Sequence, residues 1–292
     1  MVSPTYSVRK HRNLMYFGAF CAVIIPDFIV GGLLLYNRCI TESNRITNML
    51  IYQLPDRHPV GGFLFQTKRG ATVADNKQIV SKRRISDHGE VFTAPREVNA
   101  MLDLVKQETQ RIDSRFLEPA CGKGAFLTEI LRRKLEIVNS RYRKSQIEYE
   151  RYMALAVSSI YGIDILPDNV ADCRSLLLGI CIDNYASACK LKCACIPTDF
   201  IETLRFILDK NIVLGDALTL KRVDGSNAPI VFSEWSLVMG DMFKRRDFYF
   251  SSLVDSEMGG EYCRSDMGGG TWMPVPVREF PLTHYKRLKD AE

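Results

Sequence analysis

Residues 115–127, RFLEPACGKGAFL, decide the fold that the sequence predicts. Residues 115–118 form a short apolar stretch typical of a strand, and residues 119–124 form a glycine-containing turn. The periodic apolar residues from 125 to 143 predict a helix directly after that turn. A strand, a glycine turn and a helix in this order are typical of the first unit of a parallel α/β sheet.

The same alternation of strands and helices continues along the chain. Short apolar runs predict further strands, and residues with one apolar face predict the helices between them. The predicted strands are 115–118, 159–164, 211–216 and 229–232, and the predicted helices are 95–112, 125–143 and 169–185. This alternation predicts an α/β fold with a mostly parallel sheet and helices on both faces.

Three of the predicted strands end in an acidic residue: Glu118, Asp164 or Asp216. In open α/β sheets ligands bind at the carboxyl ends of the strands, so these acids and the loop 119–124 are expected to converge. A glycine turn before a helix N-terminus favours a phosphate or carboxylate, and an acid at the next strand end can accept hydrogen bonds from ribose. Taken singly, Asp164 or Asp216 is more typical of a helix cap or a loop. Together the three acids predict a nucleoside-containing ligand.

The composition is that of an ordinary globular protein. The chain has 292 residues, 46% of them apolar and 25% charged, which predicts one principal domain. Its net charge of +5 permits an acidic partner such as nucleic acid without indicating one. Nine irregularly spaced cysteines favour free thiols in a reducing cytoplasm. The cluster Cys189, Cys193 and Cys195 lacks a nearby histidine, so we expect no metal site.

The sequence divides into four segments. Residues 1–48 form an apolar extension or anchor, residues 49–84 a basic linker or arm, residues 85–250 the main domain, and residues 251–292 a loop-rich tail. Within the first segment, the stretch 14–36 is long enough to cross a membrane, but the charge of Asp27 opposes burial in lipid. The alternatives are a buried hairpin or helix, or an extension outside the functional unit with Met49 as the start.

Two blocks of sequence resemble the opening motifs of the N6-adenine DNA methyltransferases of restriction-modification systems. They are DHGEVFTAP at 87–95 and FLEPACGKGAFL at 116–127, of which the second is the more specific. YGID at 161–164 and GDAL at 215–218 follow in the order typical of that family. The resemblance spans about residues 85–236. It implies a Rossmann-like methyltransferase fold, S-adenosylmethionine as the cofactor, and adenine in DNA as the methyl acceptor.

The resemblance also implies a role for individual residues. Phe92 and Thr93 would border the methionine end of the cofactor, and the loop at Glu118 would lie beneath it. Asp164 would bind the ribose and Asp216 the adenine amino group. The cofactor-binding set that the resemblance implies is Phe92, Thr93, Glu118, Pro119, Gly122, Gly124, Asp164 and Asp216.

The sequence departs from the family after the fourth predicted strand. Family members have Asn/Asp/Ser-Pro-Pro-Tyr/Phe there, whereas this chain has Ser233-Glu234-Trp235-Ser236. Ser233 would offer an oxygen to the adenine amino group and Trp235 a stacking face, while Glu234 adds a charge. These three residues are the catalytic candidates. A core position for Trp235 is an equal alternative, because the two prolines that shape the loop are absent.

The C-terminal part bears on what the protein does. Only 56 residues follow Ser236 in the 292-residue chain, too few for the remaining strands, the back helices and a target-recognition domain. The run 244–250 is either a DNA contact or a solvated turn before an edge strand. The motif resemblance favours an enzyme that transfers a methyl group from S-adenosylmethionine to N6 of adenine in DNA within a restriction-modification system. The alternative is a non-catalytic or incomplete modification subunit that binds cofactor or DNA and needs a partner, such as a specificity or restriction subunit.

Overall fold

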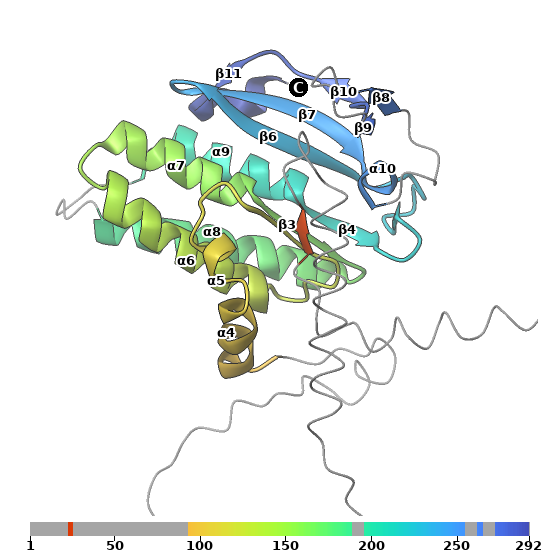
Figure 1. Ribbon diagram of the computed structural model, residues 1–292, viewed down its shortest axis with the longest axis horizontal. Helices are drawn as coiled ribbons and strands as arrows, with labels where there is room; N and C mark the ends of the chain where they lie inside the picture. Colours follow the sequence, from red (N-terminus) through yellow and green to blue (C-terminus); the bar gives the residue numbers. More distant parts are fainter. Residues whose placement is uncertain (1–22, 26–92, 189–195, 255–261, 265–271, 292) are drawn as a thin grey trace, which may run out of the picture.

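The computed structural model describes residues 23–25, 93–188, 196–254, 262–264 and 272–291 (Figure 1). These residues form an α/β structure with a mixed sheet. Phe92, the cysteine cluster at 189–195 and nearly all of segments 1–48 and 49–84 lie outside the described residues.

The main sheet has the strand order β1-β2-β3-β4-β5. Its three central strands are parallel, with Leu117 opposite Tyr161 and Ile163 opposite Val213. The outer strands β1 and β5 pair antiparallel to their neighbours. The strands are β1 (Val23–Ile25), β2 (Arg115–Glu118), β3 (Ile160–Asp164), β4 (Ile212–Asp216) and β5 (Lys221–Arg222). The bounds that the sequence predicted for β2, β3 and β4 are therefore confirmed to within one residue.

The helices connect these strands and cover the sheet. The described helices are α4 (Pro95–Asp103), α5 (Lys106–Thr109), α6 (Ala125–Tyr142), α7 (Gln146–Ser158), α8 (Pro167–Ala188), α9 (Thr198–Asn211), α10 (Phe250–Val254) and the 3-10 helix η2 (Tyr285–Ala291). The single helix predicted at 95–112 is interrupted after Asp103. The predictions for α6 and α8 are confirmed, whereas α7 and α9, which lead into β3 and β4, were not predicted.

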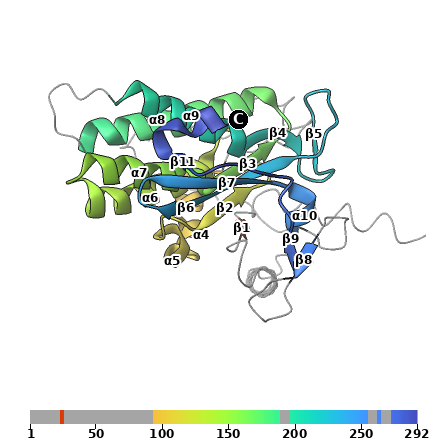
Figure 2. The ribbon, with the colours of Figure 1, turned by 90° about the horizontal axis from the view of Figure 1, so that it is seen from above.

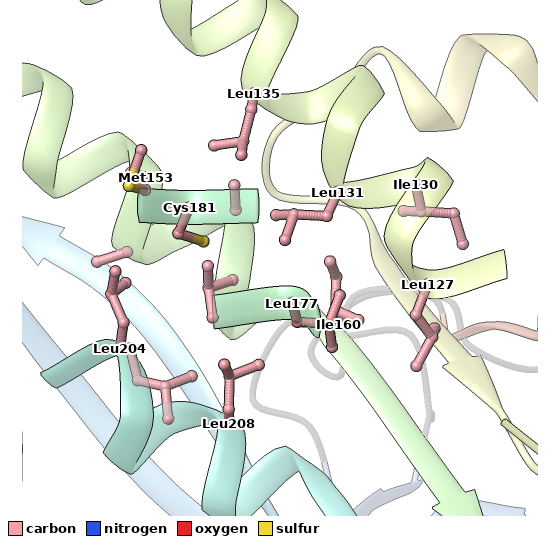
Figure 3. Close-up of a cluster of buried hydrophobic side chains, with 14 of the residues drawn as sticks. Leu127, Ile130, Leu131, Leu135, Met153, Ile160, Leu177, Cys181, Leu204 and Leu208 are labelled. Atoms are coloured by element: carbon pink, nitrogen blue, oxygen red, sulfur yellow. The ribbon is translucent and has the colours of Figure 1, made fainter. Parts of the chain in front are cut away.

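The core follows from the alternation of side chains along the parallel strands. Phe116, Ile160 and Ile212 point to the face that packs against the helices. Figure 3 shows part of this cluster, with Leu131 of α6 and Leu177 of α8 beside Ile160. On the opposite face, the apolar cluster consists of Leu117, Tyr161, Ile163, Val213, Ile230, Phe232 and Phe250.

An antiparallel sheet lies over part of that opposite face, through Phe232 at its start, and also packs against α7 and α9 (Figures 1 and 2). Its strands β6 (Val231–Met239) and β7 (Met242–Tyr249) form a hairpin, and β10 (Arg278–Glu279) and β11 (Thr283–His284) pair with β7. The predicted fourth strand, 229–232, is the beginning of β6 and belongs to this sheet. The helices that the sequence predicted all pack on one face in the described residues, and the other face is covered by the start of β6 and the short helix α10, so the expectation of helices on both faces is not met as predicted.

The structure describes only parts of the two terminal segments. Within the apolar stretch 14–36, the described residues Val23–Ile25 form an edge strand beside β2. In the described ranges, no helix has the length and apolar character that crossing a membrane requires. In the described part of the segment 251–292, β10 and β11 pair with β7, and η2 packs on α9. A further hairpin there joins β8 (Tyr262–Arg264) to β9 (Trp272–Pro274).

Candidate functional site

The carboxyl ends of β2 and β3 hold the loop that the sequence singled out. The backbone N–H of Gly122 donates to Asp164 Oδ2 at 2.8 Å. One residue earlier, the N–H of Cys121 donates to the carbonyl of Ile163 at 2.9 Å. The loop after β2 is thus attached to the end of β3, and the structure brings Glu118, Gly122 and Asp164 together at one edge of the sheet.

Two glycines give this loop its shape. Gly122 has φ +52° and Gly124 has φ +89°, a left-handed region that glycine adopts without strain. Gly124 is the residue before α6, and a Cβ atom there would lie 2.7 Å from the sulfur of Cys173 on α8. The backbone therefore approaches α8 more closely than any other residue type allows.

Glu118 ends β2 with a buried carboxyl group. Burial raises its pKa from 4.5 to about 8, and the hydrogen bond from the backbone of Ala120 opposes the rise only in part. At neutral pH the carboxyl group is therefore mostly protonated. A cation placed beside it would favour the ionised form, so the charge of this carboxyl group would respond to a cationic ligand.

Asp164 ends β3 and is also buried. Its Oδ1 accepts hydrogen bonds from the N–H of Leu166 at 2.9 Å and from Asn169 Nδ2 at 3.3 Å. Its Oδ2 accepts the N–H of Gly122. Since each carboxylate oxygen can accept two hydrogen bonds, Oδ2 keeps the capacity to accept one more, for example from a ribose hydroxyl.

Asp216 ends β4, the next strand along the sheet. Its carboxylate accepts hydrogen bonds from the N–H of Leu218 at 2.8 Å and from the hydroxyl of Thr219 at 3.0 Å, so it shapes the turn after the strand.

Among the other implied cofactor residues, Pro119 is half-buried in the loop after β2. Thr93 is half-buried and precedes α4, which packs against α6.

The three catalytic candidates lie elsewhere. Ser233, Glu234 and Trp235 are buried in the interior of β6, so the expectation that they form a loop after a short fourth strand is wrong. The strand is longer than predicted because it pairs with β7 along most of its length. Its start lies near the carboxyl end of β4, where Ile230 packs against Gly215.

From there β6 runs toward the amino ends of the parallel strands. Trp235 Nε1 donates to Asn211 Oδ1 at 2.9 Å, and Asn211 is the residue directly before β4. Glu234 binds Arg115, the first residue of β2. The structure therefore does not bring the catalytic candidates to the loop at Glu118. Trp235 takes the core position that the sequence left open.

Glu234 and Ser233 also hold the hairpin together. Glu234 binds Arg246 on β7 at 3.0 Å, and the Ser233 hydroxyl donates to Asp247 at 2.7 Å. The basic run 244–250 that contains these partners is mostly β7 rather than a turn.

Sequence reasoning missed the contribution of α8 to the site. Asn169 supports Asp164, and Cys173 fills the space beneath Gly124. Cys121 and Cys173 are buried free thiols, and the hydrogen bond to Cys173, together with burial, raises the pKa of Cys121 well above its ordinary value. Cys121 stands in the loop motif, but nothing in the sequence shows that α8 brings Cys173 to it.

Comparison of the chain with protein family models, with curated proteins and with solved structures finds no match.

Proposed function

We propose that this chain binds S-adenosylmethionine through a Rossmann-like domain and acts as a modification subunit that needs a partner to methylate adenine in DNA. The observation that carries the proposal is the hydrogen bond from Gly122 to Asp164, which joins the glycine loop after β2 to the acid that ends β3. The motif resemblance names the cofactor, and the carboxyl edge of a parallel sheet is where such a ligand binds.

The residues at this edge have chemistry that suits the cofactor. Glu118 can accept the cationic methionine end when its carboxyl group ionises, and Asp164 can accept a ribose hydroxyl. The N–H groups of the first turn of α6 have no acceptor within the helix, which favours a carboxylate nearby. S-adenosylmethionine, when bound, supplies an electrophilic methyl group on a sulfonium.

The need for a partner follows from the position of β6. In the resembling family the residues that hold adenine follow the fourth strand, next to the cofactor. Here Ser233–Trp235 are engaged in the hairpin and lie beside the amino ends of β2 and β4. We therefore infer that another subunit supplies the adenine-binding groups. Methyl transfer by this chain alone is the second candidate function, and the same motif resemblance supports it.

Calorimetric titration of S-adenosylmethionine into the full chain tests the cofactor site. We expect a Kd in the micromolar range, about −8 kcal/mol. Asp164→Ala should weaken binding at least tenfold, because it removes the ribose acceptor and the anchor of the loop. Asp183→Ala is the matched control, since Asp183 is exposed on the same helix, α8, that follows Asp164. Absence of binding by the folded wild-type chain would refute the proposal.

A methylation assay tests the need for a partner. The chain incubated with DNA and S-adenosylmethionine should form no N6-methyladenine, although it binds the cofactor. Product formation at ordinary enzyme rates would refute the subunit role and support the second candidate function. If product forms, Ser233→Ala tests whether β6 takes part in methyl transfer. An unchanged rate would mean that Ser233, which is remote from the glycine loop, has no role in the reaction.

A further inference from the structure

A groove of about 610 Å³ lies at the amino ends of β2 and β3, the edge opposite the glycine loop. Its volume falls within the range of small-molecule sites. Its walls come from the segment before β2, the end of α6, one side of α7 and the second half of β6. The residues that line it include Arg111, Arg115, Arg141, Tyr142, Tyr152 and Trp235.

One wall of the groove is aromatic. The rings of Tyr142, at the end of α6, and Tyr152, on α7, stack with their centroids 3.7 Å apart and their planes 10° apart. Both rings are half-buried, and Trp235 adds a third aromatic side chain to the lining. Planar aromatic surface of this kind stacks with nucleobases whatever their sequence.

The groove also carries guanidinium groups. Arg111 binds Asp113 at 3.3 Å, and both are well exposed. Arg115 lines the groove and shares the carboxylate of Glu234, which is outside the lining, with Arg246 of β7. Within the described part of the chain, no salt bridge involves Arg141, which lines the groove next to Tyr142 at the end of α6. Guanidinium groups beside aromatic rings suit a ligand that joins a base to a phosphate.

A buried lysine lies beneath the floor. Lys134 on α6 is fully buried, and its ammonium donates to the Ile112 carbonyl at 3.1 Å, to the Ser114 carbonyl and to the Ser159 hydroxyl at 2.5 Å. Ile112 and Ser159 both line the groove. Burial lowers the pKa of Lys134 to about 7. An anion in the groove would favour the protonated form of Lys134. The positive charge of this lysine would then add to the attraction between the anion and the arginines.

We propose that this groove binds a nucleotide, with its base against Tyr142 and its phosphate between Arg111 and Arg141. The inference does not rest on the proposed function, because the groove and the glycine loop lie at opposite edges of the sheet. The nucleotide is either free in solution or an unpaired nucleotide of a nucleic-acid strand, and the two sources share the base and phosphate chemistry that the groove recognises.

Intrinsic fluorescence of the full chain tests the proposal. Of the two tryptophans, Trp235 lines the groove, so a Trp272→Phe background leaves a single reporter at the site. The probes are thymidine 5′-monophosphate and a short oligothymidylate, whose base differs from the adenine of S-adenosylmethionine. We expect saturable quenching of Trp235 by at least one probe.

Matched variants separate stacking from charge. Tyr142→Ala should weaken binding about tenfold, whereas Tyr142→Phe, which keeps the ring, should bind like the wild type. Arg141→Ala should weaken binding several-fold and reduce its salt dependence. Arg143→Ala removes the same charge from the same helix end, outside the groove lining, and should have little effect.

The two probes distinguish the sources. Binding of the mononucleotide with comparable affinity supports a free nucleotide, and binding of the oligonucleotide alone supports a strand. Asp164→Ala should leave either result unchanged, because Asp164 lies at the other edge. Absence of saturable quenching by both probes would overturn the proposal, and so would quenching that is indifferent to both Tyr142→Ala and Arg141→Ala.

Discussion

Glu118 is a buried acid at the end of a strand, and its burial makes the stability of the protein depend on pH. Its pKa is 4.5 in an exposed state and about 8 in the folded protein. Between these values the folded state holds a proton that the unfolded state has lost. The stability that protonated Glu118 contributes is therefore fully present below pH 4.5 and is lost as the pH rises through 8.

Glu118→Gln should remove this pH dependence, since the amide has the shape of the protonated acid and does not ionise. The pKa difference corresponds to at most about 5 kcal/mol. We expect the variant to match the wild type near pH 4.5 and to exceed it in free energy of unfolding at pH 9, as measured by urea denaturation. Glu136→Gln, at an exposed position of α6, is the control and should follow the wild type at both pH values. Parallel pH profiles for wild type and Glu118→Gln would contradict the assignment.

At the scale of the elements, the start of α6 depends on the space between Gly124 and α8. Gly124→Ala has two costs: an alanine at φ +89° is strained, and its Cβ would meet the Cys173 sulfur at 2.7 Å. We expect a loss of about 3 kcal/mol in the free energy of unfolding. Gly122→Ala is the matched control, because its φ is +52° and nothing lies within 4 Å of the added carbon. It should cost only about 1 kcal/mol.

Removal of the Cys173 sulfur separates the steric cost of Gly124→Ala from its backbone strain. If contact with Cys173 causes the larger loss, Gly124→Ala combined with Cys173→Ala should recover part of the stability that Gly124→Ala loses. No difference between Gly124→Ala and Gly122→Ala in thermal unfolding would show that the contact is unimportant.

The sequence predicted those strands and helices that are marked by a contiguous run of apolar residues or by a turn. The strands at 115–118, 160–164 and 212–216 are short apolar runs that end at an acid, and α6 and α8 follow turns. The helices α7 and α9 were missed, although both have caps or apolar faces that could have indicated them. Ser145 accepts the N–H of Glu148 at the start of α7, and α9 buries Phe200, Leu204 and Ile207 along one side.

The length and direction of β6 could not be predicted, because they depend on partners distant in sequence. Ser233 and Glu234 are polar, which favours a loop at the local level. In the structure Glu234 binds Arg115 and Arg246, and Ser233 binds Asp247, so burial of these polar groups is compensated. The glycine loop was placed correctly because its motif is contiguous. The position of the catalytic candidates was wrong because it required the partner strand.

At the scale of the whole molecule, a single buried acid joins the C-terminal helix to the core. Glu150 on α7 is fully buried and accepts hydrogen bonds from Tyr185 on α8 and from Tyr285 on η2, each at 2.8 Å. Lys286 on η2 binds it at 2.9 Å. Burial alone would raise the pKa of Glu150, but its hydrogen bonds hold the pKa below the ordinary value. One carboxylate thus stabilises three helices together.

Tyr285→Phe should weaken this junction, because it removes one hydrogen bond to a buried carboxylate and keeps the ring. We expect a loss of about 2 kcal/mol in the free energy of unfolding. Hydrogen exchange should show faster opening of η2 than of α6. Tyr249→Phe is the control, since Tyr249 is exposed on β7. An unchanged unfolding midpoint for Tyr285→Phe would show that η2 is held by its apolar contacts instead.

The two thiols where the glycine loop meets α8, Cys121 in the loop and Cys173 on α8, can report local opening of the protein. Cys121 and Cys173 are buried where the loop meets α8, and Cys181 is buried deeper in the helical core (Figure 3). A thiol reagent can reach the first two only when the loop and α8 separate, and the third only when the core opens. Alkylation rates at these three cysteines therefore report two motions in one unmodified chain, and a ligand that closes the loop would slow the first without altering the second.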